Sequence, residues 1–142
     1  MDSPRYMLDT NALFELVKQP AGAVARHIAA EGEDSICTSI VVACELRYGA
    51  AKKGSGALTE KIERLLSSVE VLPLDQGVDR QYADLRTRLE QAGQPISAHD
   101  LLIAAHALTV GLTVVTANER EFRRVSGLSV ENWLDKLPDE EA

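Results

Sequence analysis

Short apolar runs alternate with helical segments along this chain, and that alternation most constrains how it can fold. Strands are predicted at residues 5–8, 35–38, 69–73, 112–115 and 128–130. Helices, in which apolar residues recur at every third or fourth position, are predicted at about 10–18, 20–32, 40–53, 58–66, 75–92 and 98–110. Apolar strands separated by helices are typical of a parallel sheet with both faces covered. We therefore predict an α/β fold with a mostly parallel sheet.

Helix starts are marked by small polar side chains, which can accept hydrogen bonds from the first free backbone N–H groups of a helix. Thr10 or Asn11 is expected to cap the first helix, and Ser39, Asp75 and Ser97 are expected to cap three later ones. No internal repeat or linker divides the chain. Residues 1–137 are expected to form one domain, followed by an acidic tail at 138–142.

Composition narrows the class of protein. No apolar run reaches the roughly 18 residues of a membrane span, so a soluble cytoplasmic protein is expected. Cys37 and Cys44 lack metal-binding spacing and are predicted to be buried in a reducing compartment. The net charge of −7 disfavours broad nucleic-acid binding, which needs a basic face. Local basic residues at 52–53 and 120–124 keep a nucleic-acid substrate possible in principle.

Four acidic residues lie at the edges of strongly apolar segments: Asp9, Glu45, Asp100 and Glu121. Ligands of open α/β sheets bind at the carboxyl ends of the strands. Asp9 follows the first strand and Glu121 follows the fourth, while Glu45 and Asp100 lie on helices beside the second and fourth. If the first and fourth strands are neighbours, all four carboxylates converge. Such a cluster needs cations, and oxygen-only ligands favour Mg²⁺ or Mn²⁺ and phosphodiester hydrolysis.

Each carboxylate also has a purely structural interpretation. Asp9 could cap a helix, and Glu45 could form a buried ion pair with Arg47 or another arginine. Asp100 could simply complement a helix dipole, and Glu121 could belong to a solvated loop. The conjunction of the four is more specific than any one of them.

Other chemistries find little support in the sequence. His27, His99 and His106 lack the spacing of a metal-binding pair, so we predict structural or peripheral roles for all three. No glycine-rich phosphate loop, nucleophile elbow or Cys–His pairing is present.

Five segments carry a resemblance to a known family. They are LDTN at residues 8–11, CELRYGA at 44–50, AHDLLIAAHA at 98–107, VTANEREF at 115–122 and VSGLSVENW at 125–133. In this order and spacing they resemble the PIN-domain ribonucleases, and more narrowly the VapC-type toxins of bacterial VapBC toxin–antitoxin pairs. The resemblance covers almost the whole chain.

The resemblance implies a three-layer α/β/α sandwich around a mostly parallel, five-stranded sheet. It implies acidic metal ligands at Asp9, Glu45 and Asp100, and the fourth acidic position of the family, often Asp, falls on Glu121. Our hypothesis is that Asp9 and Asp100 bind the metal, with Glu45 and Glu121 reaching it directly or through water. The positions expected to line or support this site are Thr10, Asn11, Ser39, Thr116 and Asn118. One departure is Ala117, where relatives often carry a second polar residue.

The same resemblance implies a metal-dependent endoribonuclease toxin that cleaves RNA, with transfer RNA favoured, and thereby inhibits translation. It implies a small antitoxin covering the active site, a toxin homodimer and a higher toxin–antitoxin assembly. Two alternatives stay open: a phosphoacceptor signalling domain, and a non-catalytic nucleic-acid-binding domain. No Lys follows the fourth strand between residues 110 and 121, which disfavours the first. The acidic charge and few aromatic residues disfavour the second.

Overall fold

A single sheet organises the molecule. The computed structural model describes residues 4–134, and the predicted acidic tail at 138–142 lies outside them. The strands of this part are β1 (Tyr6–Leu8), β2 (Ile36–Ser39), β3 (Glu70–Leu72), β4 (Thr113–Val115) and β5 (Val130–Glu131). Their order is β3-β2-β1-β4-β5 and every pair is parallel. The prediction of a mostly parallel, five-stranded sheet is confirmed.

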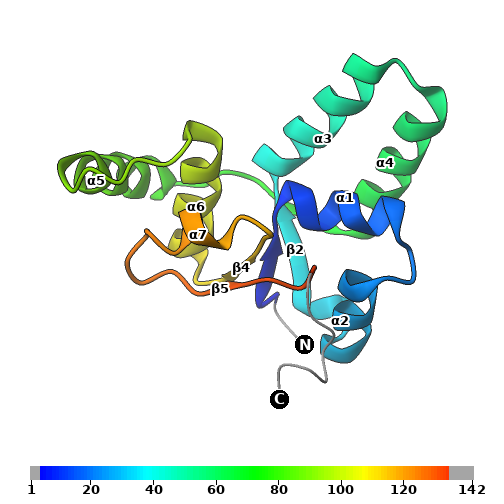
Figure 1. The fold of residues 1–142 in the computed structure, drawn as a ribbon, viewed down its shortest axis with the longest axis horizontal. Coiled ribbons are helices and arrows are strands. Elements are labelled where there is room, and N and C mark those ends of the chain that lie inside the picture. The colour runs from blue at the N-terminus through cyan, green and yellow to red at the C-terminus, as the bar shows by residue number, and fades with distance from the viewer. Residues whose placement is uncertain (1–3, 135–142) are drawn as a thin grey trace.

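Helices complete a three-layer α/β/α sandwich. They are α1 (Thr10–Lys18), α2 (Ala23–Glu31), α3 (Ile40–Lys53), α4 (Gly56–Ser68), α5 (Val78–Gln91), α6 (Ala98–Val110) and the short α7 (Glu119–Phe122), with a 3-10 turn at Glu33–Ser35. In Figure 1, α1 to α4 lie to one side of the strands and α5 to α7 to the other. The α3–α4 hairpin and helix α5 extend away from the strands.

The centre of the sheet is its most apolar part, because it is covered from both sides. Met7 and Leu8 of β1, and Val114 and Val115 of β4, are fully buried. Leu8 pairs with Val115, so β1 and β4 end side by side. Strand β1 lies at the centre of the sheet, with β2 and β3 on one side and β4 and β5 on the other. The strand order therefore reverses at β1. Ligands of such sheets bind at this reversal point.

Three helix starts differ from the sequence prediction. Helix α2 begins at Ala23, after Gly22, instead of at residue 20. Asp9, rather than Thr10 or Asn11, caps α1, because its side chain accepts a hydrogen bond from the Thr10 backbone N–H. Helix α5 begins at Val78 instead of near Asp75. The Val78 N–H bonds back to the Asp75 carbonyl at 3.3 Å and closes a turn before the helix. This turn holds Gly77 at a φ of 102°, in the left-handed region that favours glycine.

The prediction that both cysteines are buried is wrong for one of them. Cys37 lies in the sheet core, but Cys44 is exposed. It lies on the same side of α3 as Ile40 and Tyr48, which are 37% and 66% exposed. Apolar residues surround this helix, and periodicity therefore could not show which side faces solvent.

The end of the described chain is held by aromatic packing at the start of β1, the opposite end of that strand from Asp9. Trp133 is fully buried. The His27 ring of α2 stacks on it at 5.0 Å, and the Tyr6 ring meets it edge-on at 4.9 Å. This packing is consistent with the structural role predicted for His27. No helix within residues 4–134 has the length and apolar character needed to cross a membrane.

Candidate active site

The ends of β1 and β4 place the first two site residues together. The Asp9 backbone N–H donates to the Val115 carbonyl at 2.9 Å, continuing the pairing of the two strands by one residue. Asp9 and Thr116 therefore leave the sheet at the same edge. The condition for convergence of the four carboxylates, that the first and fourth strands are neighbours, is met.

Asp9 is buried, at 3% exposure, and both of its carboxylate oxygens are engaged. Oδ1 accepts from the Thr10 N–H at 2.8 Å, while Oδ2 accepts from the Thr116 hydroxyl at 2.8 Å and from Asn11 Nδ2 at 3.4 Å. Burial raises the pKa of Asp9, and the Thr116 and Thr10 bonds oppose that effect. The charge of Glu45 raises the pKa further. Asp9 thus caps a helix and also faces another carboxylate.

Hydrogen bonds hold the segment after β4, residues 116–118, against the start of α1. Asn11 Oδ1 accepts from the Ala117 N–H at 2.9 Å, and Thr116 Oγ1 accepts from the Asn118 N–H at 2.9 Å. Only the backbone of Ala117 takes part. The missing polar side chain at this position therefore leaves the described contacts of the loop intact.

Asp100 lies in the first turn of α6, behind the Ser97 cap. Its Oδ2 accepts from Asn118 Nδ2 at 2.9 Å. The pKa of Asp100 is raised to about 6, first by burial and then by the charge of Asp9 and the close approach of Glu121. The bond from Asn118 acts in the opposite direction. A carboxyl group whose pKa is raised by burial and by neighbouring carboxylates is typical of a site that lacks a positive counter-charge.

Glu121 reaches the same place from a different local structure than expected. It lies on the short helix α7 instead of in a solvated loop. Asn118 precedes this helix, and its Nδ2 also donates to Glu121 Oε2 at 3.2 Å. One amide group therefore bridges Asp100 and Glu121. The helix was too short to be predicted from periodicity.

Glu45 completes the set from the second turn of α3. The ion pair that could have explained it is absent, because Arg47 forms two 2.9 Å hydrogen bonds with Glu63 of α4. Oε1 of Glu45 is buried and has no hydrogen-bond partner among the described residues. A buried carboxylate oxygen without a partner is costly, so a group that residues 4–134 do not provide is expected to bind there.

The electrostatics of the cluster suit a hard cation. Within residues 4–134, none of the four carboxylates forms an ion pair with Lys, Arg or His. The donors are oxygens, the type that Mg²⁺ and Mn²⁺ prefer. In the same described range, no three Asp, Glu, His or Cys side chains form a ready-made metal cage. The residues therefore fit a cation in chemistry and position, without being drawn into a closed coordination shell.

The remaining predicted residues support the site from outside the carboxylate cluster. Thr10 provides its backbone N–H to Asp9, while its hydroxyl is buried and unpartnered among the described residues. Ser39 is fully buried, caps α3 and contacts His106 on α6. His106 was predicted to be only structural or peripheral, so its contact with Ser39 was not anticipated. The one indication in the sequence was its position between two alanines on an apolar helix, where a polar side chain is unusual.

Comparison with known proteins decides the family. The family model for the PIN domain matches residues 6–128, which contain all four carboxylates. The chain belongs to the PIN-domain family. A curated relative, Ribonuclease VapC2 of Rickettsia felis, is 37% identical over 130 residues, covering 90% of this chain and 97% of the relative. The tRNA(fMet)-specific endonuclease VapC of Shigella flexneri is 37% identical over 134 residues, covering 91% and 98%.

Solved structures agree with this assignment. VapBC2 from Rickettsia felis, bound to a DNA fragment from its promoter, has a TM-score of 0.83 at 34% identity and covers 90% of this chain and 98% of its own. DNA-bound VapBC from Salmonella typhimurium has a TM-score of 0.83 at 33% identity and covers 92% and 98%. This PIN-domain chain is therefore similar to the VapC proteins in sequence and fold, over nearly the whole length of those proteins.

Proposed function

We propose that this PIN-domain protein is a metal-dependent endoribonuclease toxin that hydrolyses RNA phosphodiester bonds, with transfer RNA as its preferred substrate. The observation that carries the proposal is the meeting of Asp9, Glu45, Asp100 and Glu121 at one sheet edge without a cationic partner among the described residues. The names of the similar ribonucleases support RNA as the substrate. Cleavage of transfer RNA would inhibit translation, and we propose that the protein acts in the cytoplasm, where translation takes place.

The proposed Mg²⁺ or Mn²⁺ is held by Asp9 and Asp100, with Glu45 and Glu121 binding directly or through water. When bound, such an ion activates water for attack and neutralises charge on the phosphodiester. The chain itself arranges the ligands. Thr116 holds Asp9 in place from β4, and Asn118 holds Asp100 beside Glu121. The buried, unpartnered oxygen of Glu45 would be available to the ion or to a water bound to it.

The proposal is tested by incubating the purified protein with total transfer RNA in Mg²⁺, in Mn²⁺ and in excess EDTA. We expect cleavage with either metal, none in EDTA, and recovery when metal is restored. Mapping the new RNA ends identifies the substrate and the cleaved bond. RNA binding without any metal-dependent cleavage would instead support a non-catalytic binding domain.

A matched pair of variants separates the site from general charge effects. Asp9→Asn removes one carboxylate charge from the cluster and should abolish cleavage. Asp34→Asn makes the same chemical change at an exposed position before β2, near the opposite end of the sheet. It should leave cleavage unchanged. Equal activity of the Asp9 variant and the Asp34 variant would contradict the assignment.

We further propose that a small antitoxin protein neutralises this toxin. Several similar structures are VapBC proteins, and one of them is described as a member of the VapBC family of toxin–antitoxin systems, from Mycobacterium tuberculosis, at a TM-score of 0.59 and 28% identity. An antitoxin Arg placed among the carboxylates would replace the metal charge, because a guanidinium binds carboxylates in a bidentate manner.

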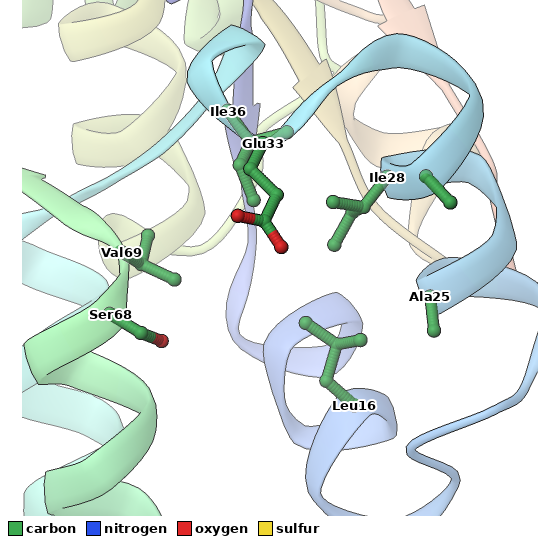
Figure 2. Close-up of a pocket in the computed structure, with 8 residues that line it drawn as sticks. Leu16, Ala25, Ile28, Glu33, Ile36, Ser68 and Val69 are labelled. Atoms are coloured by element: carbon green, nitrogen blue, oxygen red, sulfur yellow. The ribbon is translucent and has the colours of Figure 1, made fainter.

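A groove outside the carboxylate cluster is suited to the rest of such a partner. Two adjoining hollows share Leu16 and Ser68 and lie between α1, α2 and α4. Figure 2 shows the first, where Leu16 and Ile28 lie across from Val69. Its lining is mostly apolar, so an apolar face of an antitoxin helix would bind here.

Charged residues at the groove would determine the orientation in which a partner helix binds. Glu33 lines the first hollow, whereas Lys61 and Arg64 line the second. A partner helix with a basic residue at one end and an acidic residue at the other matches this arrangement in one orientation only. The apolar lining would thus provide affinity for the partner, and the charged residues would set its orientation.

We also propose that the toxin forms a homodimer, within a larger toxin–antitoxin assembly. Ile40, Cys44 and Tyr48 lie four residues apart on the exposed side of α3. A second copy covering this side would bury apolar surface that is open in the single chain. Sedimentation of wild-type protein and of Tyr48→Arg tests this: we expect a dimer that the substitution dissociates.

A further inference from the structure

A buried hydrogen bond joins two helices that carry site carboxylates. His106 Nδ1 lies 2.8 Å from Ser39 Oγ, and the two residues are 1% and 0% exposed. Ser39 is the cap of α3, the helix of Glu45, and His106 is on α6, the helix of Asp100. The proposed cation site is therefore connected to a polar contact within the core.

The hydrogens of this contact can be assigned. Ser39 Oγ accepts from the Val41 N–H at 3.1 Å, so the hydroxyl hydrogen is available for His106 Nδ1. The ring then carries its own hydrogen on Nε2, on the side of the Pro73 carbonyl, which can only accept. Burial lowers the pKa of His106 and so favours the neutral ring, and in the Nε2–H form Nδ1 is the acceptor. The result is a directed contact from Ser39 to His106.

The other side of the ring shows that this arrangement is costly. Nε2 is buried, and no described residue forms a hydrogen bond of good geometry with it. The Pro73 carbonyl is near enough to oppose the effect of burial on the pKa, but it does not satisfy the nitrogen geometrically. A leucine between Ala105 and Ala107 would remove this nitrogen, but it would also leave the buried Ser39 hydroxyl hydrogen without an acceptor. His106 is therefore placed by its contact with Ser39, and that contact is the link between the two helices.

Position along the two helices suggests what the contact does. Ser39 precedes Glu45 by six residues, and His106 follows Asp100 by six residues. Sliding or rotation of α3 against α6 would change the separation of the two carboxylates and would stretch the bond. We propose that His106 is a positioning residue, which through Ser39 sets the placement of Glu45 relative to Asp100 for cation binding. This inference rests on the proposed metal-dependent function.

The test uses the full chain and Mn²⁺ alone as the probe. His106→Leu removes the acceptor while keeping an apolar side chain. His106→Asn keeps it, because Asn Oδ1 can occupy the place of Nδ1. Mn²⁺ binding is measured by calorimetry, the melting temperature is measured in EDTA, and RNA cleavage is measured across Mn²⁺ concentrations. We expect Mn²⁺ binding to weaken by about tenfold in His106→Leu and to recover in His106→Asn.

The melting temperature distinguishes positioning from support of the fold. In EDTA, His106→Leu should melt close to the temperature of wild-type protein, because losing the unpaired nitrogen offsets the loss of the acceptor for the Ser39 hydroxyl. Ser39→Ala should weaken Mn²⁺ binding similarly, and adding it to His106→Leu should weaken binding no further. If His106→Leu fails to fold, His106→Gln replaces it. The polar atoms of Gln match Nε2 rather than Nδ1, so weak binding is again expected.

Two failures are distinguishable. If wild-type protein neither binds Mn²⁺ nor cleaves RNA with it, the proposed function is overturned, and this inference with it. If wild-type protein binds Mn²⁺ and the Leu or Gln variant binds it equally well, the inference alone is overturned. The inference alone is also overturned if each variant loses Mn²⁺ affinity only to the extent that its melting temperature falls, and His106→Asn does not restore the affinity.

Discussion

The Thr116 hydroxyl donates to Asp9 Oδ2 at 2.8 Å and joins residues that are 107 positions apart in the chain. The contact exists because β1 and β4 are neighbours that end at the same level. It also opposes the rise in the pKa of Asp9 that burial causes. A strand-end hydroxyl thus keeps the proposed metal ligand oriented and more readily ionised.

Replacing Thr116 with Val should therefore impair the site while keeping the shape of the strand end. Asp9 loses its shortest side-chain hydrogen bond, and the Asn118 N–H loses its acceptor. We expect cleavage to fall by about 10- to 100-fold, the usual range for partners of metal ligands. Cleavage rates at saturating Mg²⁺ measure this. Thr113→Val, on the same strand, is the control and should retain near wild-type rates.

The stability of the metal-free protein should respond to Asp100 in a pH-dependent way. The pKa of this group is about 6 in the folded protein and 3.8 in its ordinary state. The folded protein therefore binds the proton more tightly, and the stabilisation this provides is lost as pH rises from about 4 to about 6. Above that range, ionised Asp100 opposes folding.

Asp100→Asn should accordingly stabilise the apo protein at neutral pH. We expect a gain of about 1–2 kcal/mol near pH 8, allowing for solvent screening of this half-buried group, and almost none near pH 4. For a chain of this size that corresponds to a rise of about 3–6 °C in Tm. Thermal melts in EDTA at the two pH values measure it. A variant that is less stable than wild type near pH 8 would show that Asp100 is not repelled there.

Asn118 should control the pH at which the site accepts a cation. Asp100 must be ionised to bind metal, so Mn²⁺ affinity should decline as pH falls through about 6. The Asn118 hydrogen bond holds this pKa down, and Asn118→Ala should therefore move the decline to higher pH. Mn²⁺ titrations over a range of pH measure the shift. Gln91→Ala on exposed α5 should leave the curve where it is, and an unmoved curve in the Asn118 variant would contradict the assignment.

The groove between α1, α2 and α4 should be separable from catalysis. Ile28→Lys places a charge in its apolar lining, and we expect at least a tenfold loss of antitoxin affinity with unchanged RNA cleavage. Co-purification and calorimetry with the cognate antitoxin measure the first, and the RNA assay measures the second. Val110→Lys alters an exposed apolar residue at the end of α6 and should affect neither. Wild-type affinity in the Ile28 variant would place the antitoxin elsewhere.

Much of the fold followed from local pattern. The helix cap at Ser39 and the stop at Gly54 bound α3 where they were predicted, and Ser97 and Gly111 do the same for α6. Each is a local arrangement of a polar acceptor or a left-handed glycine, so neighbouring residues suffice to specify it. The start of α5 was missed because Gly77, rather than Asp75, occupies the cap position.

The four carboxylates of the proposed site could be singled out from the sequence, but their contacts could not. Asp9, Glu45, Asp100 and Glu121 stood out because charged residues are unusual beside apolar runs. Which neighbours they have depends on strand order and helix placement. The pairing of Arg47 with Glu63, the bridge from Asn118 to both Asp100 and Glu121, and the exposure of Cys44 all depend on packing between distant elements.

By itself, the sequence determined a parallel α/β sheet, its helix punctuation and the four carboxylates to be explained, because periodicity and capping act over a few residues. Only the tertiary structure decided that Asp9 and Asp100 face each other without a counter-charge from the described chain, and that His106 binds Ser39. These relationships join residues from separate strands and helices. Their energies depend on distance and burial, and neither quantity exists before the chain has folded.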